Sequence, residues 1–388
     1  MIRWIALCLL FGSCLVHAQQ QKFGIVLDAE TSYPVEFVDV FNAYDNTHTN
    51  EDGKYFMLSY GDSLTFSKIG YQKTTFHFKD LKDTLWLTPS ALKLEGVTLV
   101  SMKSTWEKVK DSLESNYMLS PFKERFFLRC LLRKNGEIVR IQDIEGKLRR
   151  KTLLYRKEMP FGKKDFEFEI SNMRKIGIEK DENDVYFTVF SLSQLLLESI
   201  RLNATGPGFS ISEKAFENED RVRINIQSDS TAGGVDTRGH YIINSRNNAI
   251  ESVVLNTTID TDNYFKNGPI RSRTIKRNQT ALFSKSAKWN KYFFGLCKML
   301  FFIEITHTKK DFRDIYTCEY ILKTFNHGDD FPFSPNVNAQ KDIFKLKHPY
   351  NEQFWTTQNN LLLTDEMKNF IETIGSSNKE FNIRTNLN

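Results

Sequence analysis

The side chains best suited to metal chemistry in this chain are its histidines. A zinc site needs three or four nitrogen, sulfur or oxygen ligands that converge on one ion. Beyond residue 18, no two histidines have the His-x-x-x-His spacing of a helical ligand pair; the residues are His48, His77, His240, His307, His327 and His348. We interpret them as strand or surface residues, and we expect no metal and no other cofactor.

Two short acidic clusters could hold calcium through their carboxylate oxygens. They are Asp181-Glu182-Asn183-Asp184 and Asp260-Thr261-Asp262-Asn263. Both also have the composition of a hairpin turn, and we favour that interpretation. No Gly-x-Ser-x-Gly elbow occurs, and Gly233-Gly234 lacks the Lys-Ser/Thr pair of a phosphate loop. The sequence therefore predicts no enzyme, although a site assembled from dispersed residues stays open as an alternative.

Aromatic side chains could instead form an apolar binding site, because the chain has 32 phenylalanines and 14 tyrosines. Residues 292–305 form its most apolar stretch, which Lys298 and Glu304 interrupt and which is shorter than the roughly 20 residues of a membrane helix. We expect a core element here. Phe293 and Phe294, together with Trp355, are candidates for the lining of an apolar ligand groove, and core packing is the alternative.

The first eighteen residues have the features of a signal peptide. Arg3 supplies the positive charge, residues 5–16 the apolar region, and Val16-His17-Ala18 the small or aliphatic residues before a cleavage site. The alternatives are a buried N-terminal strand and a lipoprotein leader acylated at Cys14. We expect cleavage after Ala18 and an exported protein, located in the periplasm or associated with the outer membrane, without a transmembrane helix in the mature chain.

Charge and cysteine content narrow the class of partner. The formal net charge is +5, but acids and bases alternate along the chain, so we expect no nucleic-acid partner. Cys130, Cys297 and Cys318 lie in apolar stretches and are odd in number, which indicates buried hydrophobic residues rather than a disulfide framework.

Residues 22–100 contain short alternating apolar runs separated by turns about every ten residues, the pattern of an antiparallel sandwich. Asp52-Gly53 suits a tight hairpin turn. The alternation places one set of side chains inside, namely Val38, Val40, Phe56, Leu58, Leu64, Phe66 and Leu87.

Several of these segments resemble the carboxypeptidase-regulatory-like domain. They are residues 23–28, Tyr33-Pro34-Val35, residues 49–56, residues 66–71 and the closing residues 94–100, in the order found in that family. Asn50 departs from the pattern, since the family usually has an acid there. The resemblance implies a transthyretin-like sandwich of about seven strands. In other exported bacterial proteins this module precedes outer-membrane receptor plugs or unexplained domains.

Residues 101–375 are predicted to form a strand-rich C-terminal domain with flanking helices. Helical spacing of apolar residues occurs over 102–118, 191–201 and 364–374, and Asn135-Gly136 between two apolar runs predicts a hairpin. Further strands are expected at 166–170, 185–190, 222–226, 241–244, 250–258 and 315–325, and a flexible tail at 376–388. Residues 239–244 with 249–253 resemble a strand pair of lipoprotein-carrier half-barrels.

The expected fold is mainly β. A seven-stranded antiparallel β-sandwich at 19–100 precedes a larger antiparallel-sheet domain of the α+β kind, for which a half-barrel is one form. We expect a non-enzymatic binding or docking protein of the envelope, whose partner is an envelope protein or an apolar ligand. The alternative is a carrier that holds a lipid-like ligand in a half-barrel groove.

Overall fold

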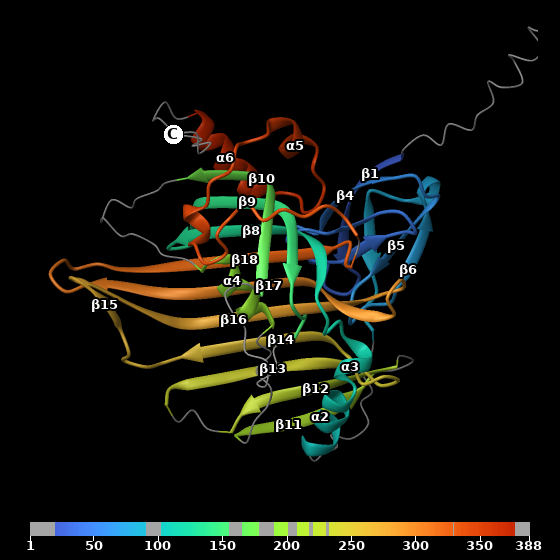
Figure 1. Cartoon of the computed structure of the whole chain (residues 1–388), viewed down its shortest axis with the longest axis horizontal. Coiled ribbons are helices and arrows are strands. Elements are labelled where there is room, and N and C mark those ends of the chain that lie inside the picture. Colours follow the sequence, from blue (N-terminus) through green and yellow to red (C-terminus); the bar gives the residue numbers. More distant parts are fainter. Residues whose placement is uncertain are drawn as a thin grey trace, which may run out of the picture. The chain divides into compact units, whose positions relative to one another are not determined.

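The structure, a computed structural model, describes residues 20–90, 102–154, 165–177, 190–200, 208–216, 220–229, 233–328 and 330–376. It is mainly β, with antiparallel sheets and few helices, as the sequence predicts (Figure 1). The chain divides into two compact units. Residues up to 90 together with 358–368 form the first unit, and residues 91–357 with those from 369 onward form the second.

The first unit contains the seven predicted strands in two sheets. One sheet has the order β4-β1-β7 and the other β3-β2-β5-β6. The strands are β1 (Gln20–Asp28), β2 (Asp39–Phe41), β3 (Asn46–His48), β4 (Lys54–Ser59), β5 (Ser63–Ser67), β6 (Thr74–His77) and β7 (Thr84–Leu87), with a 3-10 turn η1 (Phe78–Asp80) before β7. The β1–β7 pair is parallel, whereas the sequence predicted antiparallel strands throughout.

The core of the first unit differs from the sequence prediction in one strand. Val38, Val40, Leu64, Phe66 and Leu87 are buried as expected. In β4, by contrast, Tyr55 and Met57 point inward, and Phe56 and Leu58 lie on the half-buried opposite face. Both faces of β4 carry large apolar residues, so alternation alone could not fix which face points inward.

Residues 358–368 complete the first unit from the far end of the sequence. Thr47 Oγ1 donates to the carbonyl of Asn359 at 2.8 Å, and Asn50 Nδ2 donates to that of Leu363 at 3.2 Å. Asp52 Oδ2 accepts from the amide of Asp365 at 2.8 Å. The domain predicted over 19–100 therefore takes in a segment that the sequence assigned to the C-terminal domain.

The second unit contains one 11-stranded sheet with the order β10-β9-β8-β18-β17-β16-β14-β13-β12-β11, with β15 pairing at β16. Its strands are β8 (Phe122–Lys134), β9 (Glu137–Arg150), β10 (Phe166–Gly177), β11 (Phe209–Ala215), β12 (Arg221–Ser228), β13 (Val235–Asn244), β14 (Ile250–Ile259), β15 (Phe265–Asn267), β16 (Ile270–Ser286), β17 (Lys291–His307) and β18 (Arg313–Phe325). The other elements are α2 (Met102–Asp111), α3 (Leu113–Asn116), α4 (Leu192–Ile200), η2 (Ile343–Lys345), α5 (Glu352–Thr357) and α6 (Asp365–Ser376), which begins in the first unit.

Most of the elements expected in this region are present. Asn135 and Gly136 have positive φ angles of 50° and 94°, so they form the predicted turn between β8 and β9. The helix expected over 102–118 is split at Ser112 into α2 and α3. The strand expected at 185–190 and the acidic turn at 181–184 fall on residues outside the described ranges, apart from Phe190.

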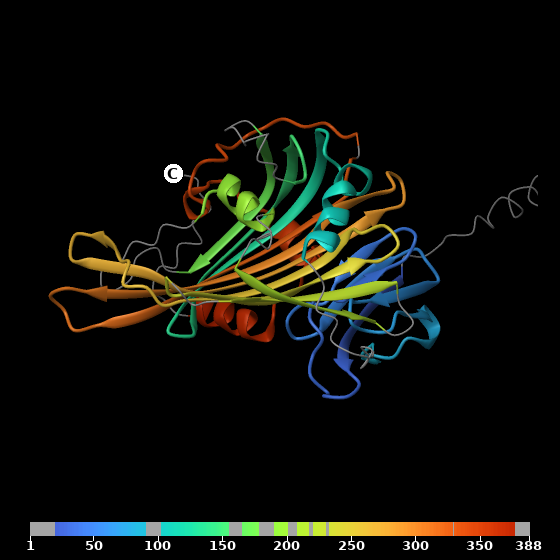
Figure 2. The ribbon, with the colours of Figure 1, turned by 90° about the horizontal axis from the view of Figure 1, so that it is seen from below.

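The sheet is strongly curved, and its concave face is filled by the chain itself (Figure 2). Helix α4 buries Leu192, Leu195 and Leu196 in the main hydrophobic core on that face. Gln279 Nε2, from β16, donates to the Ser199 carbonyl at 3.1 Å and so fixes the end of the helix. Among the described residues, the curved sheet therefore packs against α4 in one apolar core.

A segment that we call the strap, residues 330–346, closes the edge of the sheet at β10. Asn336 acts as a strand partner, because its Oδ1 accepts from the amide of Ile170 and its Nδ2 donates to the Ile170 carbonyl, both at 2.8 Å. Its own amide donates to the Phe168 carbonyl at 3.1 Å. Farther on, Ile343 and Phe344 enter the main core. The strap thus passes around the edge strand into the concave face.

The opposite face of β8–β10 carries a buried ion network beneath α5. Arg129 Nε lies 2.9 Å from Asp143 Oδ1, and Arg174 Nε lies 2.8 Å from Asp143 Oδ2. Burial alone would raise the pKa of Asp143, but the two guanidinium groups hold it below its ordinary value. Trp355 covers the network, with its ring 4.7 Å from the Arg174 guanidinium carbon.

Asn336→Ala tests whether the strap depends on this edge pairing. We expect the free energy of unfolding to fall by about 1–2 kcal/mol, because two hydrogen bonds to the edge strand are lost. Urea unfolding measures the change. The control is Asn338→Ala, since Asn338 Oδ1 accepts only a local bond from Gln340 at 2.9 Å. Equal stability of the two variants would contradict the assignment.

His240 should give the protein a pH-dependent stability. Burial, aided by the nearby Arg223 charge, lowers its pKa to about 4. Between its ordinary pKa of about 6.5 and that value, the unfolded chain takes up a proton that the folded chain does not, so stability falls as the pH falls. His240→Gln should remove this part of the loss between about pH 7 and about pH 5 in urea unfolding. The control, His77→Gln at an exposed position, should keep it.

Candidate functional site

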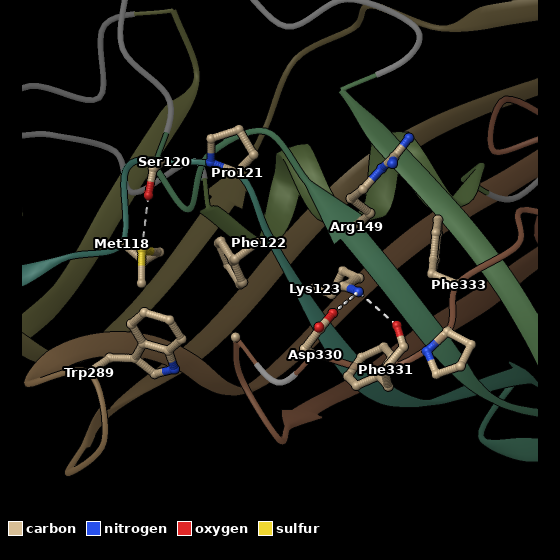
Figure 3. Close-up of a pocket in the computed structure, with 12 residues that line it drawn as sticks. Met118, Ser120, Pro121, Phe122, Lys123, Arg149, Trp289, Asp330, Phe331 and Phe333 are labelled. Atoms are coloured by element: carbon tan, nitrogen blue, oxygen red, sulfur yellow. Dashed lines mark hydrogen bonds and ion pairs between the residues drawn. The ribbon is translucent and has the colours of Figure 1, made fainter.

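A pocket of about 730 Å³ opens at the end of the sheet where β8 begins and β9 ends (Figure 3). Four parts of the second unit form its walls: the link from α3 to β8, the end of β9, the β16–β17 turn and the start of the strap. The lining residues are Met118, Ser120, Pro121, Phe122, Lys123, Arg149, Trp289, Gly328, Asp330, Phe331, Pro332 and Phe333.

Lys123 is the polar centre of the pocket. Its ammonium group donates to Asp330 Oδ1 at 2.9 Å and to the Phe331 carbonyl at 2.7 Å, and it lies 5.4 Å from the centroid of the Phe331 ring. The Asp330 side chain is fully exposed, while only 26% of the Lys123 side chain is exposed. The hydrogen bond from Lys123 lowers the pKa of Asp330, so this residue is a carboxylate at neutral pH.

Arg149 supplies a second cation at the pocket. It lies directly opposite Lys123 on the neighbouring strand, and its guanidinium carbon is 5.5 Å from the centroid of the Phe333 ring. Its Nε donates to Glu167 Oε2 at 2.6 Å. Like charges opposite one another on adjacent strands repel. Here Lys123 lies beside Asp330 and the Phe331 ring, and Arg149 lies beside Glu167 and the Phe333 ring.

Trp289 forms an aromatic wall that the fold holds in place. Its indole Nε1 donates to the His327 carbonyl at 3.1 Å, yet 41% of the residue is exposed. Gly328 has a φ of +69°, and a Cβ there would come within 2.5 Å of Trp289 Nε1. The residue beneath the indole must therefore be glycine, both for its backbone angle and for the space.

Behind the pocket wall lies a layer of buried aromatic and polar groups. Phe122 packs edge-on against Phe293 at 5.3 Å, and the His327 ring stacks on Phe293 at 4.6 Å. His327 Nε2 lies 3.6 Å from Glu124 Oε2, and Glu124 forms a buried ion pair with Arg150. Neither Glu124 nor His327 lines the pocket. These groups fix the position of Phe122.

The structure does not bring the three residues predicted for a groove into one site. Phe293 and Phe294 are fully buried in the main core, and Phe293 supports the pocket from behind. Trp355 packs against Phe127 at 6.4 Å, on the opposite face of the sheet. None of the three lines the described pocket.

The sequence analysis missed the residues that do line the pocket. Trp289 lies in a hairpin turn, and Lys123 is the second residue of β8, which the sequence indicated only as an apolar run before the Asn135-Gly136 turn. The run Pro332-Phe333-Ser334-Pro335, at the edge of the pocket, predicts a loop and no more than that. An exposed tryptophan in a turn was the feature that could have indicated the site.

Of the other candidate sites, the acidic cluster at 260–263 has a structural partner, while the cluster at 181–184 lies outside the described residues. The guanidinium group of Arg273 lies 4.0 Å from Asp260 and 3.8 Å from Asp262. Cys130, Cys297 and Cys318 are free and buried. Among the described residues, no group of three or more histidine, cysteine or acidic side chains could hold a metal. Over the same residues, every helix is too short or too polar to span a bilayer.

Comparison with known proteins gives little guidance. No family model and no curated protein matches the chain. A solved structure titled "Lipid-protein interactions in lipovitellin" is similar at 7% identity with a TM-score of 0.26, and the match covers 63% of this chain and 29% of that one. The chain thus matches less than a third of that protein's length, and a likeness at this level carries no argument about function.

Gly328→Ala tests whether the glycine at position 328 is needed to hold the Trp289 side chain in place. Alanine should cost about 1–2 kcal/mol for the left-handed backbone, and more for the collision with the indole. We expect Trp289 to be displaced, so that acrylamide quenches its fluorescence more strongly. The signal of Trp289 is isolated by subtracting the fluorescence of the same protein that also carries Trp289→Phe. The control is Gly136→Ala, where φ is +94° and a Cβ would meet nothing within 4 Å. Unchanged quenching in Gly328→Ala would contradict the assignment.

Proposed function

We propose that this chain is an exported, non-enzymatic binding protein whose pocket takes a small amphipathic ligand with a carboxylate or phosphate group. The observation that carries the proposal is the position of Lys123. Its ammonium group lies between an exposed carboxylate and an aromatic ring, at the polar end of a pocket whose other walls include Trp289, Phe122 and Met118.

The polar end of the pocket suits an anionic group because the present counter-ion is easily exchanged. Asp330 is fully exposed, and ion pairs at the surface contribute little to stability. A ligand anion could therefore replace Asp330 at Lys123 at small cost. The Phe331 carbonyl would remain a partner of the ammonium group and keep it in position.

The apolar end suits a hydrocarbon chain or a ring. Trp289 offers an open face, and its indole N–H already has a partner in the His327 carbonyl. A ligand need not supply a hydrogen bond at that point, so apolar contact is sufficient. Pockets of this kind, mostly apolar with a few placed polar groups, are typical of small-molecule sites.

Binding is favoured over catalysis by the groups that line the pocket. Its ionisable side chains are Lys123, Arg149 and Asp330. The lowered pKa of Asp330 makes this carboxylate a poor proton donor or acceptor near neutral pH. The carrier alternative would need space on the concave face, where α4 and the strap contribute Leu195, Leu196 and Phe344 to the main core of the described residues.

The cellular location of the protein and the family of its first domain are proposed from the sequence. The features of residues 1–18 support export to the periplasm or the outer membrane. The resemblance of residues 22–100 supports a carboxypeptidase-regulatory-like module, and the two-sheet, seven-strand first unit is compatible with it. An envelope protein could be a further partner of that unit.

Titration with decanoate and decyl phosphate, below the concentrations at which they form micelles, tests the proposal. We expect both to quench Trp289 and the neutral decyl maltoside to bind more weakly, because only the anions can pair with Lys123. Lys123→Met should weaken anion binding about tenfold or more, the usual effect of losing a charge-assisted hydrogen bond.

The matched control is Lys276→Met, which also removes a cation beside an aromatic ring, 5.3 Å from the centroid of Phe302, outside the pocket. It should bind the anions like the parent. Equal binding by Lys123→Met and the parent, or no binding of either anion by the parent, would overturn the proposal. The carrier alternative would be favoured if all three amphiphiles bound to the parent and if, among the variants, only Leu195→Asp abolished this binding.

A further inference from the structure

Two hairpin tips lie side by side at the far end of the large sheet. The first is the β15–β16 turn, residues 264–272, and the second is the β17–β18 turn, residues 306–313. Ile270 pairs with His307, and the Thr308 amide donates to the Pro269 carbonyl at 2.8 Å. Figures 1 and 2 both show these hairpins extending past the ends of the neighbouring strands.

The tips carry an excess of exposed positive charge. Lys266 and Arg271 face one another across β15 and β16, and Lys309 and Lys310 follow on the adjoining turn. One acid, Asp311, lies among them, so these five groups sum to +3. Like charges opposite one another weaken a strand pair. The fold therefore bears a cost here that an anionic partner would remove.

The remaining charges near the tips are already paired at their base. Arg273 and Arg313 both bind Glu304, at 3.0 Å and 2.7 Å through their Nε atoms. Asp260 and Asp262 lie within 4.0 Å of Arg273. These two arginines and three acids sum to −1, so the tips and their base together carry a net charge of +2, and the tip cations lie beyond the base.

An aromatic side chain is displayed among these cations. Phe265 is 73% exposed, as much as any large hydrophobic residue of the described chain. Its neighbour Tyr264 is held at the base by a 2.8 Å hydrogen bond to Glu304. Phe265 has no such tie. A phenylalanine in this position loses contact with water only when a partner covers it.

The backbone of the tips is well fixed, so the display does not depend on a flexible loop. His307 Nδ1 accepts from the amides of Lys309 and Lys310 at 3.0 Å and 2.8 Å. Arg273 Nη1 donates to the Thr261 carbonyl at 2.7 Å. The backbone that carries the cations and the aromatic ring is therefore held in place.

From this arrangement we infer that the two hairpin tips bind the surface of an anionic lipid bilayer. Phe265 enters the headgroup region, and Lys266, Arg271, Lys309 and Lys310 pair with lipid phosphates. Aromatic and basic residues together are the usual composition of segments that lie in a membrane interface. The inference is independent of the pocket, which lies at the opposite ends of strands β17 and β18.

Co-sedimentation of the full chain with vesicles tests the inference. We expect binding to phosphatidylcholine vesicles that contain phosphatidylglycerol, little binding to phosphatidylcholine alone, and a decline in binding as salt is raised. Lys309→Glu/Lys310→Glu should weaken binding about twentyfold or more, because each cation near an anionic surface contributes about fivefold. Phe265→Ser should weaken it about tenfold, because the ring no longer leaves water.

Each variant has a control with the same chemical change. Lys79→Glu/Lys82→Glu makes the same charge change on the first unit, and Tyr44→Ser removes an aromatic residue that is also 73% exposed. Both controls should bind anionic vesicles like the parent. The inference is overturned if the parent does not bind these vesicles, if the tip variants bind like the parent, or if the controls lose binding equally. If the parent protein bound the vesicles but not decanoate, the result would contradict the proposed pocket and not the membrane inference.

Discussion

The pairing of Asn336 with the edge of β10 holds the strap in place, and both a wall of the pocket and part of the core depend on the strap. An open sheet leaves the amides and carbonyls of its edge strands without partners, and such edges invite association with other chains. Here one side-chain amide supplies both a donor and an acceptor to Ile170. It also holds the middle of the strap, whose first residues form a pocket wall and whose last residues enter the core.

This arrangement explains why the candidate site lies at the rim of the sheet and not within its curve. The concave face is apolar, and α4 and the strap bury it with side chains of the same chain. The described pocket lies where strands end and the strap departs. At that place the strap brings Phe331 and Phe333 beside Lys123 and Arg149, which lie opposite one another on adjacent strands.

Local patterns predicted the fold class well and the site poorly. The Asn135-Gly136 hairpin could be predicted because its turn chemistry is local. The inward face of β4 could not, since Tyr55 and Phe56 are equally able to fill a core and only the opposing sheet decides. Strand β16 was missed because its first half is rich in arginine and lysine and shows no alternation. Trp289, Gly328 and Lys123 are far apart in sequence, and their contact arises from strand order, which no local signal specifies.

The segment 358–368 makes the first unit discontinuous, so this unit can be completed only after that segment has been synthesised. Asn50 and Thr47 find their partners about 310 positions further along the chain. Loop closure over such a length costs only slightly more entropy than closure over half of it, so the final stability loses little. The timing changes more, because during synthesis the N-terminal sandwich lacks these hydrogen-bond partners until residues 358–368 have emerged. A premature stop after residue 357 would therefore leave the first unit without the segment that binds Thr47 of β3 and Asn50 before β4.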